Sequence, residues 1–247
     1  LFWMLFLPVA SVWSLDALLK KKQQRVPDRV LSVASAAILL QVAYVYFFSG
    51  LAKWNTYWLS GAAMEYAMNL EMYVKPNGAW LGQNTEWLQV ITLLTLAAEV
   101  AGPVLMFVPR CSGFFRGCLM AVFWMLHLGI WLTMSIGIFS AVAMLAWVVF
   151  VPTEAWRSLL GKPAIDHGSK TAPLRGTNHR ALNGIAAVFL MYITLQNVFF
   201  TFLPLEGGVD KPRTVIGTVA AKIEWFGRVT MTVQQFRMFD TPPLFDP

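Results

Sequence analysis

The chain has 247 residues, of which 57% are apolar and 13% are charged, and its mean hydropathy is +0.57. So large an apolar share excludes a soluble globular domain and a disordered chain, and two cysteines exclude a disulfide-stabilised scaffold. The net charge of +6 comes from basic residues scattered between apolar runs, so we expect no binding of nucleic acid.

Long apolar runs predict an all-α fold, a polytopic bundle of transmembrane helices. A hydrocarbon core of about 30 Å requires roughly 20 residues at 1.5 Å rise each. About six runs meet this requirement: residues 1–19, 31–48, 88–108, 115–133, 136–151 and 181–203. The first run begins without an initiator methionine and contains Asp16, so we expect further helices upstream. We predict a transmembrane domain over residues 1–203 and a short C-terminal segment over residues 204–247.

The basic residues between the runs predict the orientation. Three alternate loops, residues 20–29, 109–116 and 152–180, contain twelve Lys and Arg, counting Arg180 at the end of the last loop. The opposite side has only Lys53 and Lys75 before the C-terminal segment. By the positive-inside rule the loop of residues 20–29 is cytoplasmic, and residues 49–87 and 204–247 lie on the exoplasmic or periplasmic side.

Two ionisable residues within the runs are candidate catalytic groups, because charge is costly inside a bilayer. Glu99 lies near the middle of its run, and His127 lies at a similar depth in the next. The two runs form a hairpin through Pro109, so the side chains can meet. They would then form a proton-sharing pair, or a plain hydrogen bond between two helices.

Lys53 is the third candidate catalytic residue, because it directly follows an apolar run on the side that lacks bases. Three aromatic residues follow it closely: Trp54, Tyr57 and Trp58. Partial desolvation would favour a neutral amine that acts as base or nucleophile. The alternative is a lysine that reaches to the membrane surface within an aromatic belt.

The residues around Lys53 predict a substrate-binding site and its cover. Gln41 and Tyr44 share one face of the preceding run. Residues 57–73 are amphipathic and too polar to span, so we expect one interfacial or re-entrant helix that covers the site. A turn follows at residues 75–78. We find no metal-ligand cluster, phosphate loop or internal repeat.

Four stretches resemble the vitamin K-dependent γ-glutamyl carboxylase superfamily, whose bacterial members are the HTTM proteins. The first consists of residues 46–55 (YFFSGLAKWN) with Trp58, Gly61 and Met64. The second consists of His127, residues 134–140 (MSIGIFS), Pro152, Glu154, Trp156 and Arg157. Shorter likenesses are Leu7 and Pro8 with residues 14–18 (SLDAL), and residues 234–239 (QQFRMF).

The resemblance implies a role for each candidate residue. In the carboxylases the lysine that matches Lys53 is the base that deprotonates vitamin K hydroquinone, whose anion reacts with O2 before carboxylation of glutamate. Transferred here, Lys53 would deprotonate a quinol or another lipid-soluble substrate, and His127 would act near it or handle protons. Trp54, Tyr57 and Trp58 would stack on the ring. The resemblance also implies a bacterial plasma membrane.

Two departures from the carboxylases limit this implication. The lysine that precedes their catalytic lysine is replaced here by Ala52, and only about 40 residues follow the last run in place of a large lumenal domain. We therefore do not expect carboxylation of protein glutamate. Two other functions stay open: a non-catalytic accessory or scaffold subunit of a membrane complex, and a toxin-maturation or immunity protein. The cofactor is unknown, with a quinone as the candidate, and the expected partners are membrane lipids and other integral membrane subunits.

Overall fold

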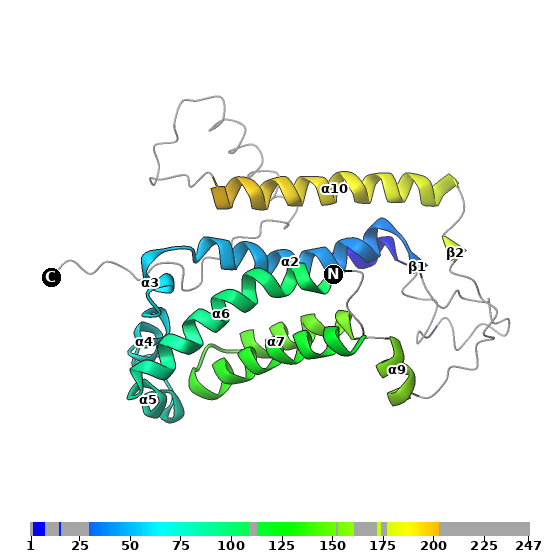
Figure 1. The fold of residues 1–247 in the computed structure, drawn as a ribbon. Helices are drawn as coiled ribbons and strands as arrows, with labels where there is room; N and C mark the ends of the chain where they lie inside the picture. Colours follow the sequence, from blue (N-terminus) through cyan, green and yellow to red (C-terminus); the bar gives the residue numbers. More distant parts are fainter. Residues whose placement is uncertain are drawn as a thin grey trace, which may run out of the picture.

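The computed structural model describes residues 2–7, 15, 30–108, 113–151, 153–160, 172–173 and 177–202, and confirms the all-α prediction for these ranges (Figure 1). The elements are η1 (Phe2–Phe6), β1 (Val30–Leu31), α2 (Val33–Ala52), α3 (Thr56–Leu59), α4 (Ala63–Met68), α5 (Pro76–Gly82), α6 (Thr85–Met106), α7 (Gly113–Thr133), α8 (Phe139–Ala146), η3 (Trp147–Phe150), α9 (Thr153–Leu160), β2 (Ala172–Pro173) and α10 (Thr177–Phe202). The two strands have two residues each, so helices carry the architecture.

Four of the described helices are long and apolar enough to cross a membrane: α2, α6, α7 and α10. The predicted run of residues 136–151 contains a shorter apolar segment, α8 followed by η3, over Phe139–Phe150. Of the predicted run of residues 1–19, the described part consists of η1 with residues 7 and 15, and the rest lies outside the described residues. The structure therefore supports four of the six predicted spans.

Helix α2 lies at the centre of the bundle, with α10 on one side and α6 and α7 on the other (Figure 1). Two hydrogen bonds fix the direction of α10. Asn183 Oδ1 accepts from the backbone N–H of Val33 at 3.3 Å, and the Tyr44 and Thr194 hydroxyls lie 3.1 Å apart. Between the two bonds the residue numbers increase in the same direction on both helices, because each bond joins residues 150 positions apart. Helices α2 and α10 therefore run parallel.

Backbone contacts between segments distant in sequence define the two ends of the bundle. At the end that contains Lys53, Val74 and Met134 form an antiparallel bridge, and the Lys75 side chain donates to the Trp131 carbonyl at 2.5 Å. At the opposite end β1 pairs in parallel with β2. Residues 49–87 thus share one end with the turn near residue 135, as the charge pattern predicts.

The segment after α2 differs from the single predicted helix. It forms α3 and α4, separated by Gly61 with a φ of 83°, a left-handed conformation that favours glycine. A Cβ on Gly61 would lie 3.0 Å from Gln89 Cβ, so this turn also packs closely on α6. The turn predicted at residues 75–78 is the start of α5, because Pro76 occupies a first-turn position that lacks a hydrogen-bond acceptor.

Candidate functional site

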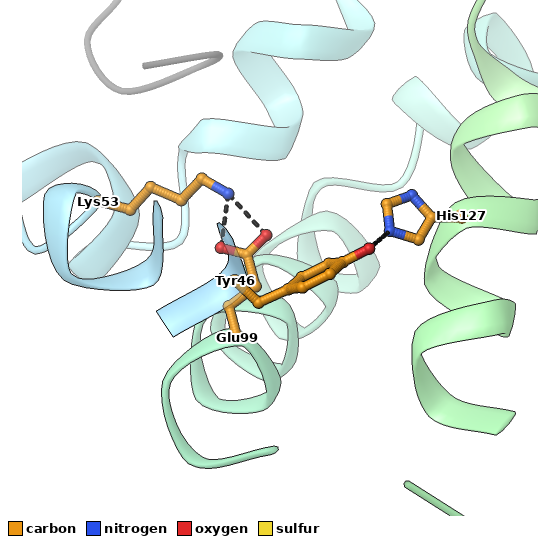
Figure 2. A network of polar contacts seen from close by, with 4 residues as sticks. All are labelled: Tyr46, Lys53, Glu99 and His127. Carbon is orange, nitrogen blue, oxygen red and sulfur yellow. Dashed lines mark hydrogen bonds and ion pairs between the residues drawn. The ribbon is translucent and has the colours of Figure 1, made fainter. Parts of the chain in front are cut away.

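One face of α2 carries the polar residues that point toward α6 and α7. Tyr46, Gly50 and Lys53 are spaced at i, i+4 and i+7, so they lie above one another along the helix. Tyr46 is 6% exposed and Lys53 is 7% exposed. Figure 2 shows their side chains pointing toward Glu99 of α6 and His127 of α7.

Lys53 and Glu99 form a buried ion pair between α2 and α6. The Lys53 Nζ donates to both carboxylate oxygens, at 2.6 Å and 2.5 Å, and Glu99 is 7% exposed (Figure 2). Gly50 makes the contact possible, because a Cβ there would lie 2.8 Å from Val100 Cγ2 and 3.1 Å from Glu99 Cβ. The missing side chain lets α6 approach α2 closely enough to bring the carboxylate to the ammonium.

Trp58 of α3 packs against the Lys53 side of the ion pair. Its ring centroid lies 4.7 Å from Lys53 Nζ, and its side chain is 3% exposed. Asn55 caps the N-terminus of α3, the short helix that contains Trp58. Its side-chain oxygen accepts from the N–H groups of Tyr57 and Trp58. Of the three aromatic residues that follow Lys53, only Trp58 is buried, since Trp54 and Tyr57 are 63% and 42% exposed.

A second polar pair, formed by Tyr46 and His127, lies beside the first. The Tyr46 hydroxyl and His127 Nε2 are 2.6 Å apart, and His127 is 3% exposed (Figure 2). The rings of Phe123 and Trp147 stack at 3.9 Å and both pack against Tyr46. The predicted meeting of Glu99 with His127 is replaced by two pairs, because each residue has a partner on α2 instead.

The ion pair lies well inside the length of α6. Glu99 is fourteen residues after Thr85, the start of α6, and this spacing corresponds to about 21 Å along the axis. Lys53 is in direct contact with Glu99, so the two share one depth. The contact therefore places Lys53 Nζ at the level of the residue that the sequence predicts near the middle of its run.

Gln41 and Tyr44, the predicted substrate-binding residues on α2, lie away from this site. Gln41 Oε1 accepts from Trp3 Nε1 of η1 at 2.5 Å, and Tyr44 contacts Thr194 of α10. Tyr44 is two residues from Tyr46, and two residues turn a helix by about 200°, so the two tyrosines face opposite sides. Their described contacts join helices to one another.

Tyr46 and Gly50 are site residues to which sequence reasoning assigned no role. Both belong to the stretch that carries the family resemblance, and their spacing from Lys53 is a signal that could have identified them. Within the described ranges no three His, Cys, Asp or Glu side chains lie close enough together to hold a metal ion. The site therefore consists of two hydrogen-bonded acid–base pairs enclosed by aromatic rings.

The model of the HTTM domain matches residues 1–156, which include both polar pairs. The chain belongs to the HTTM domain family. In this HTTM protein α10 lies beyond the matched region. No curated protein and no solved structure matches the chain.

Proposed function

We propose that this HTTM protein is an integral membrane enzyme in which Lys53 acts as general base toward a quinol or another weakly acidic, lipid-soluble substrate. The observation that carries the proposal is the buried Lys53–Glu99 pair. A lysine and a carboxylate in hydrogen-bond contact away from water are equipped to move a proton. A simple helix contact would not require ionisable groups at this depth.

The proposed step begins with proton transfer inside the pair. The Lys53 ammonium gives a proton to Glu99, which leaves a neutral amine beside a neutral carboxylic acid. The amine then takes the hydroxyl proton of the substrate and becomes an ammonium, while the substrate becomes an anion paired with it. His127 and Tyr46 lie close to this position and would handle protons for the same substrate.

Substitution of Lys53 tests this step. Protein in lipid nanodiscs is mixed with a lipid-soluble naphthohydroquinone under argon, and absorbance of the hydroquinone anion is measured. We expect the wild type to generate the anion stoichiometrically, and Lys53→Arg to fail although it retains the charge, because a guanidinium stays protonated. Monodisperse elution of the variant is the control for folding. Unchanged anion formation in Lys53→Arg would refute the proposal.

A non-catalytic accessory subunit is the second candidate function. One observation favours it: Lys53 and Glu99 neutralise one another, so the pair can act simply as a clamp between α2 and α6. If the protein is an accessory subunit, a stoichiometric partner subunit should co-purify with it from native membranes in mild detergent. A protein that elutes alone would count against it.

We further propose that the Lys53 end is exoplasmic in a bacterial plasma membrane, with six spans in residues 1–203 and residues 204–247 on the same side as Lys53. Large exposed tryptophans support a membrane surface at this end: Trp54, Trp80, Trp87 and Trp131 are each at least 53% exposed. In a cysteine-free background, a membrane-impermeant maleimide added to intact cells should label Glu71→Cys and not Lys22→Cys. The reverse pattern would refute the orientation.

A further inference from the structure

The Lys53 amine is enclosed by groups from two other helices. The Glu99 carboxylate of α6 contacts Nζ, and the ring centroid of Trp58 of α3 lies 4.7 Å from the same atom. All three residues are buried. A substrate must come within hydrogen-bond distance of Nζ to give up a proton, so either Glu99 or Trp58 has to move before it binds.

Glu99 is held in place by close contacts of α6 with two neighbouring helices. A Cβ on Gly50 of α2 would lie 3.1 Å from Glu99 Cβ. Three residues after Glu99, a Cβ on Gly102 would lie 2.7 Å from the Phe123 ring of α7. Helices packed this closely on both sides resist displacement. Glu99 therefore forms the fixed wall of the site.

Trp58 belongs to a much smaller element. Helix α3 has four residues, and Trp58 is the one that is buried, whereas Tyr57 and Leu59 are exposed. The helix begins at the side-chain cap of Asn55 and is followed by the left-handed turn at Gly61. Segments that bury few side chains open locally more often than the bundle around them. Helix α3 is therefore the part of the enclosure that can move.

We propose that Trp58 is the gate of the Lys53 site: its ring leaves Nζ when α3 opens, and an aromatic, lipid-soluble substrate takes its place. The proposal rests on the proposed function, since only a molecule that reacts with Lys53 requires this access. An aromatic substrate compensates for the lost contact, because its own ring can lie over the ammonium. Trp54, Tyr57 and Leu59 are between 42% and 63% exposed beside the gate, which supports entry from the bilayer surface.

Chemical labelling of Lys53 in nanodiscs tests the gate. The probe is phenyl isothiocyanate, an apolar aromatic reagent for neutral amines, and the modified peptide is quantified by mass spectrometry relative to that of Lys75. Asn55→Ala removes the cap of α3 and should raise the labelling rate of Lys53 about fivefold. Asn55→Ser keeps a cap and should stay within about twofold of the wild type. Trp58→Ala should be labelled fastest, because no ring covers its amine.

Two outcomes would overturn the proposal. Equal rates in Asn55→Ala and wild type would show that the reagent reaches Lys53 by a route other than α3. A rate in Trp58→Ala no higher than in the wild type would show that the ring does not control access. Hydrogen exchange of the α6 amides is the control for the fold, and if Asn55→Ala speeds it, the comparison of Trp58→Ala with wild type decides. A wild type that follows these labelling rates and generates no hydroquinone anion would refute the role of Lys53 as base and retain the gate.

Discussion

Removal of one member of the Lys53–Glu99 pair should be far more damaging than removal of both. At 2.5–2.6 Å and an effective dielectric constant of about 20, the attraction between the charges is roughly 6 kcal/mol. Desolvation of two buried ions costs several kcal/mol each and offsets this attraction. Lys53→Met or Glu99→Gln alone leaves one uncompensated buried group and should lower the free energy of unfolding by about 3–5 kcal/mol. The double variant Lys53→Met/Glu99→Leu should lie within about 1 kcal/mol of wild type or above it.

The assay is reversible unfolding in mixed micelles of mild detergent and dodecyl sulfate, followed by tryptophan fluorescence. Glu71→Gln is the matched control, because it makes the same chemical change at an exposed carboxylate near the same end of the bundle, and we expect a shift below about 0.5 kcal/mol. Additive single effects of less than about 1 kcal/mol each would refute a desolvated pair.

Two further predictions concern the packing that holds the site. Gly50→Ala should lower the free energy of unfolding by about 1–3 kcal/mol, because its Cβ would press on Val100 at 2.8 Å, whereas Gly129→Ala has nothing within 4 Å and should gain up to about 1 kcal/mol. The same unfolding assay compares them, and equal effects would contradict the close contact. Lys75→Ala removes the donor to the Trp131 carbonyl in the last turn of α7 and should speed hydrogen exchange of amides 131–134, while unchanged exchange would assign this contact no role.

The sequence predicted the helices well because their length and composition are local properties. Four apolar runs became long helices, and the positions of the bases separated the two ends of the bundle as the backbone contacts do. The single helix expected over residues 57–73 was wrong, because the turn at Gly61 depends on close packing against Gln89, which is distant in sequence. The run of residues 136–151 became a shorter apolar segment, a result that composition alone does not predict.

The sequence did not predict the pairing of the candidate residues. The sequence singles out Lys53, Glu99 and His127 because ionisable residues are rare in apolar runs, and the structure places them in two neighbouring polar pairs. Which residue meets which depends on the crossing of α2 and α6, and that crossing depends on Gly50 having no side chain. Tyr46 was overlooked because a tyrosine in an apolar run resembles ordinary packing.

The parallel pairing of α2 with α10 has a consequence for biosynthesis. Glu99 leaves the ribosome 46 residues after Lys53, whereas Thr194 follows Tyr44 by 150 residues. At roughly 5–20 residues per second, the first partner arrives after about 2–9 s and the second after about 8–30 s. Nascent α2 therefore completes its charged face early, whereas its Tyr44 hydroxyl meets Thr194 only after a further 150 residues have been made.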